Sequence, residues 1–544
     1  MVELLKKNKE LVLNLIITFA FATILTILMC NSKSLTYDTI WCFHSAQKVA
    51  NGYTMYTEIN TVLTPVFFWI GALFIKIFGN AVTSLYICSG IISGIVITTV
   101  YNILKKVDKE KSGILFLAFV CLIIKNISII ATPSYNMLAL LWWFLAIFLE
   151  LKNVSENKNK IRNNIFIGIL TALAIFTKQS IGIFTLVSTI IITVFKNKVD
   201  NVKKIKEELL SKILGVLLVI FPMLIYFILT DSFFAFVNFC IGGLLDFGTQ
   251  NTIIQIPLTY LIIPTLTILG IVFSEKTRDK ILIILTITQI CMTSLILPVS
   301  NIYHLVLSML ISIPLLGGII KNVLDKEKYK IIFMMFVFCI LCVQGSTVIR
   351  EEILIENLFM SRLFGAELLL AVLLISFCGL IIIILLEKEK FLKYFMFVTI
   401  TFLFSIQLFL NYELRKNENI SDELNVYKGL NFEEEASTYL EEIIHYIKLK
   451  EREGYEVLVV SVDSSYYMAP LGRNNYIYDF ALYGSLGFKG EKVLIEQLPK
   501  DDNLLIMKSK YMMYQESKML DEFIKKNFKK VDEIYDLEVY QKNI

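Results

Sequence analysis

Charge-free, mainly apolar runs of about the length that crosses a bilayer recur along most of this 544-residue chain. Clear examples are residues 11–29, 213–229 and 368–386. A transmembrane helix needs about 20 such residues. Charged residues make up only 18% of the chain, against about a quarter in soluble domains. These features exclude a soluble enzyme, a disordered protein and a nucleic-acid binder, and they predict an all-α polytopic membrane protein.

Lysine and arginine residues are concentrated in alternate loops between the apolar runs. The candidate cytoplasmic segments carry 27 of these residues and the candidate outer segments carry six. Because cytoplasmic loops are enriched in Lys and Arg, this bias predicts a cytoplasmic N-terminus, about 13 spans and an outer C-terminus. The predicted spans lie near residues 11–29, 81–104, 113–131, 137–151, 164–177, 181–195, 213–230, 254–273, 281–297, 304–320, 331–348, 366–386 and 394–411.

Two assignments determine the odd number of spans. Residues 62–78 are apolar enough for another span, but the basic loop at 105–111 would then lie outside. We therefore assign them to a helix along the outer face, within a first outer loop at residues 30–80. The fifth and sixth spans are short and meet at an outer turn formed by Lys178 and Gln179. Residues 1–411 are thus predicted to form one transmembrane domain.

Residues 412–544 have a different composition. Their formal net charge is −7, whereas residues 1–411 carry +11. The tail has helix patterns at 432–450 and 516–528, and strand patterns at 456–462, 503–508, 531–535 and 537–541. This alternation predicts a small extracytoplasmic α/β domain, of about the size at which one hydrophobic core holds itself together.

The first outer loop holds only two carboxylates, Asp38 and Glu58. Asp38 follows closely on the first span, so it is expected at the membrane–water boundary. A carboxylate there can accept a proton from an incoming hydroxyl group. The alternative is that Asp38 is the N-cap of a helix at residues 39–50, since Asp is a preferred N-cap residue. Spacing alone leaves both interpretations open.

Several motifs follow Asp38 in a recognisable order. The helix ends in Ala50-Asn51-Gly52-Tyr53, and Tyr56-x-Glu58, Pro65 with aromatic residues, and Phe78-Gly79 come next. Pro133-Ser134-Tyr135-Asn136 marks a second outer turn, and a span at 168–178 ends in an outward lysine. This order resembles the polyprenyl-phosphate-sugar-dependent glycosyltransferases of the GT-C superfamily, in the branch of protein O-mannosyltransferases and aminoarabinose transferases.

The resemblance implies roles for particular residues. Asp38 matches the family's first-loop aspartate, which acts as the base or positions the acceptor. Glu58 matches a second acidic position that in some members helps to hold a metal or the donor phosphate. Tyr135 and Asn136 are expected to position donor or acceptor, although many relatives carry Asp where this chain has Asn136. The Lys-Pro-Pro that follows the second acidic position in aminoarabinose transferases is absent, which argues against that sugar.

Cationic groups near the outer face are candidates to bind the departing lipid phosphate, because a leaving phosphate needs positive charge or a metal. Lys178 is the first candidate, and Lys125, within the third span, is expected to face a cavity or to snorkel outward. Arg350 and Arg362 bracket the last large outer loop. His304 stands at an outer span end, where it binds phosphate or, with Glu58, a divalent cation (Mg, Mn or Zn), or is a hydrogen-bonded interfacial histidine.

The sequence therefore predicts an integral membrane glycosyltransferase in a bacterial plasma membrane. Its partners would be a polyprenyl-phosphate sugar donor, membrane lipids, and an acceptor that is a cell-envelope glycan, a glycolipid or a protein; no nucleic acid is involved. The cytoplasmic segments hold no DxD motif for a nucleotide-sugar. The alternatives are a flippase or other transporter of lipid-linked oligosaccharides, and a polysaccharide polymerase.

Overall fold

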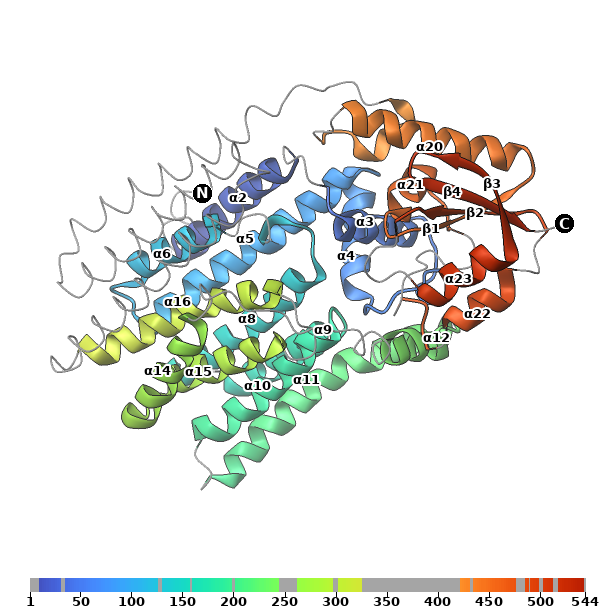
Figure 1. Ribbon diagram of the computed structural model, residues 1–544. Coiled ribbons are helices and arrows are strands. Elements are labelled where there is room, and N and C mark those ends of the chain that lie inside the picture. Colours follow the sequence, from blue (N-terminus) through green and yellow to red (C-terminus); the bar gives the residue numbers. More distant parts are fainter. Residues whose placement is uncertain are drawn as a thin grey trace.

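The computed structural model describes most of the chain up to residue 324 and most of the C-terminal segment from residue 421. The described residues are 9–30, 35–125, 130–156, 159–197, 201–243, 262–296, 302–324, 421–430, 434–475, 485–488, 490–498, 502–511 and 517–542. Helices form the first part, and a mixed helix–strand domain forms the second (Figure 1).

Long apolar helices make up the membrane part. The helices before residue 200 are α2 (Lys9–Cys30), α3 (Tyr37–Ala50), α4 (Val66–Phe78), α5 (Val82–Val107), α6 (Ser112–Lys125), α8 (Tyr135–Ser155), α9 (Lys160–Ile175) and α10 (Gln179–Asn197). They are followed by α11 (Val202–Leu229), α12 (Phe233–Val237), the π-helical turn η1 (Asn238–Gly242), α14 (Ile262–Thr277), α15 (Lys280–Thr293), the 3₁₀ turn η3 (Ser294–Ile296) and α16 (Ile302–Leu324).

These helices match the predicted spans in order. In the described part of the chain, five helices (α2, α5, α8, α10 and α11) are long and apolar enough to cross a membrane. The helices α6, α9, α14, α15 and α16 coincide with the other predicted spans up to residue 320. The last three predicted spans lie outside the described residues, so the number 13 stays a prediction. Residues 66–78 form the separate helix α4, as expected for the stretch assigned to the outer face.

Close helix packing in the membrane part depends on glycine. A Cβ atom at Gly168 of α9 would lie 1.9 Å from the carbonyl oxygen of Lys212 on α11. A Cβ atom at Gly215 would lie 2.0 Å from the carbonyl oxygen of Ile165. No larger side chain fits at either position without moving a helix. Small residues at such crossings let helices approach in lipid, where packing replaces the hydrophobic effect between helices.

A buried ionic network ties three helices together at the ends opposite the first outer loop. Lys196 of α10 lies 2.7 Å from Glu150 of α8 and 2.9 Å from Glu208 of α11. Lys212 also pairs with Glu150 and donates to Thr193 Oγ1 at 2.6 Å. The Glu150 side chain is 0% exposed. Because every charge in this network has a partner of opposite sign, the helix bundle can tolerate its burial.

The C-terminal segment is an α/β domain. Its elements are the 3₁₀ turn η4 (Asp422–Tyr427), α20 (Glu434–Arg452), β1 (Glu456–Val460), α21 (Ser464–Leu471), α22 (Gly490–Gln497), β2 (Leu504–Ser509), α23 (Lys518–Asn527), β3 (Phe528–Ile534) and β4 (Leu537–Lys542). Each predicted strand and helix is present with shifts of a few residues. The helices α21 and α22 were not predicted from the sequence. Among the predicted elements the largest shift is that of β3, which begins at Phe528 instead of residue 531 because α23 leads directly into the strand.

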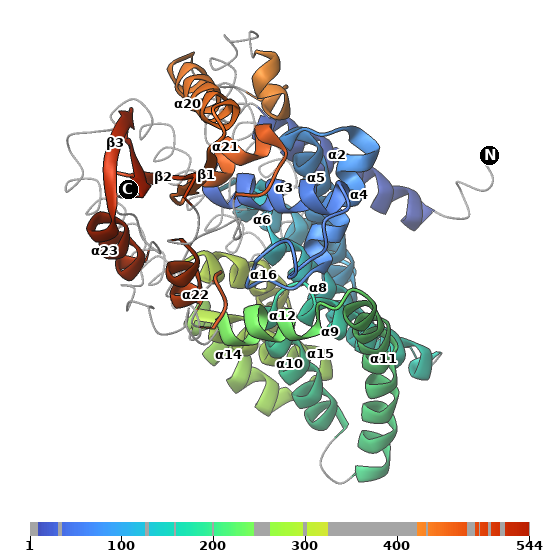
Figure 2. The ribbon, with the colours of Figure 1, turned by 90° about the vertical axis from the view of Figure 1, so that its right-hand side faces the viewer.

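The four strands form one sheet in the order β1-β2-β4-β3. β1 and β2 are parallel, whereas β4 is antiparallel to both of its neighbours. Helices α20 and α21 lie on one side of the sheet and α22 and α23 on the other (Figure 1). The domain lies next to α3, far from the lower ends of α10 and α11 (Figures 1 and 2).

Candidate active site

Asp38 lies in the first turn of α3, and it does not cap this helix. The N-cap is Thr36, whose hydroxyl oxygen accepts a hydrogen bond from the backbone N–H of Thr39 at 3.3 Å. The alternative interpretation of Asp38 as an N-cap is therefore wrong, because a residue already inside the helix cannot fill that position. The Asp38 carboxylate remains available for another role.

The side chain of Asp38 is exposed to solvent and also has protein atoms around it. Solvent reaches its side chain, yet surrounding protein atoms raise the pKa of the carboxyl group by desolvation, and the positive charge of Lys178 opposes that rise. A carboxylate whose pKa lies nearer to neutral pH is a better general base. The charge of Asp38 also acts on Cys42, one turn further along α3, and on Tyr466 of the C-terminal domain.

Lys178 lies in the turn between α9 and α10, as predicted from the short fifth and sixth spans. Its ammonium nitrogen donates to Asn136 Oδ1 at 2.5 Å and hydrogen-bonds with His304 Nε2 at 3.1 Å. It also lies 5.2 Å from the ring centroid of Tyr135. Burial lowers the pKa of Lys178 to about 7, although the charge of Asp38 opposes this fall. The amine is thus near half protonation at neutral pH, and an arriving anion would favour its charged form.

The residues around Lys178 are fixed by two helix ends. Ser134 is the N-cap of α8, and its hydroxyl oxygen accepts from Asn136 N at 3.0 Å. Trp142, two turns into α8, donates its indole N–H to Thr177 Oγ1 at 3.1 Å. The start of α8 is therefore joined to the turn that carries Lys178. Tyr135 in turn packs edge-to-face on Trp41 of α3, with ring centroids 6.3 Å apart.

The structure thus brings together five of the predicted site residues, which come from α3, α8, α16 and the α9–α10 turn: Asp38, Tyr135, Asn136, Lys178 and His304. Sequence order gives no hint of the pairing between Lys178 and His304, which are 126 residues apart. Lys178 and His304 were both predicted as site residues only because each lies at the predicted outer end of a span.

The other predicted site residues are not part of this cluster in the described residues. Glu58 is exposed, and its Oε2 accepts from the backbone N–H of Thr54 at 2.6 Å, which stabilises the loop after α3. Lys125 is the last residue of α6, and its side chain lies outside the described part. Arg350 and Arg362 also lie outside the described residues. Their proposed contacts with phosphate stay predictions.

The proposed metal ligands do not form a metal site in the described part of the chain. No group of three or more His, Cys, Asp and Glu side chains lies together there. His304 faces the Lys178 ammonium group, which would repel a divalent cation, and Glu58 is engaged in its own loop. We therefore derive no catalytic step through a metal.

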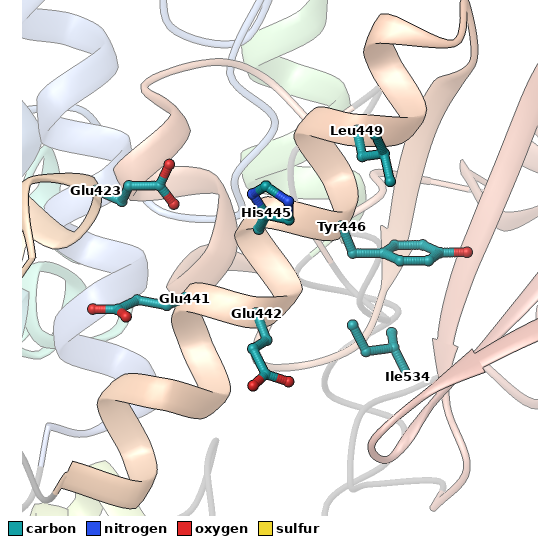
Figure 3. Close-up of a pocket in the computed structure, with 7 residues that line it drawn as sticks. All are labelled: Glu423, Glu441, Glu442, His445, Tyr446, Leu449 and Ile534. Carbon is teal, nitrogen blue, oxygen red and sulfur yellow. The ribbon is translucent and has the colours of Figure 1, made fainter.

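A cavity of about 460 Å³ lies in the C-terminal domain (Figure 3). Its lining residues are Glu423, Glu441, Glu442, His445, Tyr446, Leu449 and Ile534. Glu442 accepts from the hydroxyl of Tyr535 at 2.6 Å, and Glu423 pairs with Lys448 at 3.2 Å. None of the lining residues belongs to the cluster around Asp38 and Lys178, so the cavity has no part in the chemistry derived below.

Comparisons with known proteins concern the fold and one segment of the chain. Residues 63–226 match the model of the dolichyl-phosphate-mannose-protein mannosyltransferase family. The fold matches the crystal structure of ArnT from Cupriavidus metallidurans bound to undecaprenyl phosphate, with a TM-score of 0.57, 11% identity and 97% of each chain covered. The apo structure of the same protein matches with a TM-score of 0.57, 12% identity and the same coverage. The chain therefore shares the fold of ArnT.

The family match and the fold together confirm the resemblance to the GT-C superfamily. The matched segment includes Tyr135, Asn136 and Lys178 but neither Asp38 nor His304. No curated protein sequence matches the chain.

Proposed function

We propose that this protein is an integral membrane glycosyltransferase that moves a sugar from a polyprenyl-phosphate carrier to an acceptor on the outer face of a bacterial plasma membrane. The observation that carries the proposal is the placement of Asp38, in the first turn of α3, near enough to Lys178 for each charge to act on the other, while Asn136 and His304 bond to Lys178. The family match and the fold support the class of reaction.

In the proposed reaction, Asp38 takes the proton of the acceptor hydroxyl while that oxygen attacks the anomeric carbon. The bond between the anomeric carbon and the phosphate oxygen breaks, and polyprenyl phosphate leaves with the bonding electrons. Protonated Lys178 stabilises the charge that develops on the phosphate. Asn136 and His304 hold the Lys178 ammonium group by hydrogen bonds. One in-line displacement of this kind inverts the anomeric carbon.

The flippase alternative predicts charged side chains deep within several spans, and Glu150, Lys196 and Lys212 fit that description. However, these groups are paired with one another. Lys196 also lies 18 residues beyond Lys178 along α10, a distance of about 27 Å. A buried network this far from the residues around Lys178 is explained by its role in helix packing and needs no transport function. We therefore favour the transferase.

Replacement of Asp38 by Asn tests the proposal. Asn keeps the size and a hydrogen-bonding oxygen but cannot take the proton. A positioned base contributes about 10²–10⁴-fold to the rate, so we expect Asp38→Asn to lose at least about a hundredfold in transfer while it still binds the donor. The measurement is release of undecaprenyl phosphate from undecaprenyl-phosphate sugars in membranes that contain the variant.

Glu58→Gln is the matched control, since it removes the other carboxylate of the same loop. Because Glu58 is exposed and bonded to Thr54, this variant should lose much less activity than Asp38→Asn. Equal losses would indicate an obligatory metal at Glu58. An Asp38→Asn protein with most of its activity would refute the proposed role of Asp38, whereas a parent protein that releases no undecaprenyl phosphate would favour the flippase.

A further inference from the structure

The C-terminal domain contacts both ends of α3, the helix that carries Asp38. At the start of the helix, the Tyr466 hydroxyl donates to the carbonyl oxygen of Leu35. The Tyr466 ring also packs edge-to-face on Tyr37, with centroids 5.7 Å apart. Tyr466 belongs to α21, which lies beside α3 in both views (Figures 1 and 2). The C-terminal domain thus holds the residues that lead into the first turn of α3.

Two further hydrogen bonds join the later turns of α3 to the same segment. Gln47 Nε2 donates to the carbonyl oxygen of Ala469 at 3.0 Å, and His44 Nε2 bonds with the carbonyl oxygen of Arg473 at 3.1 Å. Gln47 and His44 are 1% and 2% exposed. Polar groups buried this deeply favour hydrogen bonds, so α21 and the residues after it contribute to satisfying α3, together with Asn80, whose Oδ1 also accepts from Gln47 Nε2 at 3.0 Å.

The membrane part contacts α3 through the ring of Trp41. This ring packs edge-to-face on Phe68 of α4, at 5.9 Å, and on Tyr135 of α8, at 6.3 Å between centroids. Helix α3 is therefore held between the C-terminal domain and the membrane helices. The position of Asp38 relative to Lys178 depends on both sets of contacts, because Lys178 belongs to the membrane part and Asp38 to α3.

We propose that Tyr466 is a positioning residue of the active site, which fixes the first turn of α3 through Leu35 and Tyr37 and so sets where Asp38 lies relative to Lys178. This inference rests on the proposed function. Tyr466 contacts two residues just before Asp38, the backbone of Leu35 and the ring of Tyr37, which immediately precedes Asp38 in α3. Tyr466 acts through Asp38 and needs no contact with the substrate.

The test is Tyr466→Phe, which removes the hydroxyl donor and keeps the ring contact. A displacement of about 1 Å at a reacting group can cost about a hundredfold in rate. Since the ring remains, we expect a loss of roughly tenfold in kcat, with the KM for undecaprenyl phosphomannose within twofold of the parent. Tyr540→Phe is the matched control, because among the described residues the Tyr540 hydroxyl bonds within the sheet, to Glu538 at 2.8 Å.

A double-mutant cycle separates positioning from general destabilisation. If Tyr466 acts through Asp38, then Tyr466→Phe adds no further loss to the Asp38→Asn variant. Losses that multiply, or a Tyr466→Phe kcat within twofold of the parent, would overturn the inference. A parent protein without transfer activity would instead refute the proposed function, and an active Asp38→Asn variant the role of Asp38, so these failures are distinguishable from a failure of the inference about Tyr466. Thermal unfolding of each purified variant confirms that the compared proteins are folded.

Discussion

The affinity of this protein for a lipid-phosphate donor should fall as the pH rises from 7 to 9. Burial lowers the pKa of Lys178 to about 7, so about half of the amines are protonated at pH 7 and about one in a hundred at pH 9. If only the protonated form holds the donor phosphate, the apparent dissociation constant rises by about fiftyfold over this range. Because protonation of Lys178 favours binding, the donor should bind more tightly at lower pH.

The assay is equilibrium binding of undecaprenyl phosphomannose to the purified protein in detergent at several pH values. This ligand is a phosphodiester, so its own charge stays constant between pH 7 and 9. Lys178→Arg is the decisive variant, because guanidinium stays protonated throughout and the pH dependence should disappear. Asp38→Asn removes the charge that raises the pKa of Lys178, so its binding midpoint should move to lower pH. A flat profile for the parent, or an unchanged slope in Lys178→Arg, would refute this reasoning.

Two other predictions follow from the membrane part. Glu150→Gln leaves Lys196 and Lys212 without their shared carboxylate and should cost about 3–5 kcal/mol of stability, measured by thermal unfolding. The control Glu156→Gln breaks a largely exposed pair with Lys106 and should cost no more than about 1 kcal/mol; equal effects would contradict the buried network. In a cysteine-free variant, single cysteines at positions 157 and 325 should resist impermeant thiol reagents in intact cells, whereas cysteines at 437 and 501 should react. Labelling at 437 and 501 only after lysis would contradict the predicted topology.

The alternation of apolar runs and basic loops was enough to predict most helices and the residues at their outer ends. Lys178 and His304 were candidates for that reason alone. Topology places residues on a common side of the membrane, but it does not say which span ends are neighbours. The hydrogen bonds from Lys178 to Asn136 and His304 depend on how the helices pack, which hydropathy does not encode.

The buried ionic network shows the same limit. Lys212 was counted among the cytoplasmic loop residues, because a charge at a span end usually faces water. Instead α11 begins ten residues earlier, at Val202, and Lys212 is 6% exposed within it. A charged side chain can be buried when a partner on another helix supplies the opposite charge. Since that partner, Glu150, is 62 residues away, no local pattern reveals the pair.

The division at residue 411 separates two compositions, but the described residues on its two sides share one hydrophobic core. Val457 and Val459 of β1 belong to the same buried cluster as Tyr467 and Met468 of α21 and as the membrane helices. The alternate residues Leu458 and Val460 face a separate cluster with α22 and α23. Because side chains alternate across a strand, one side of the sheet is packed within the domain and the other is continuous with the part that holds Asp38. A substitution on the α21 side can therefore change transfer without touching the substrate, whereas one on the α23 side should change only the stability of the domain.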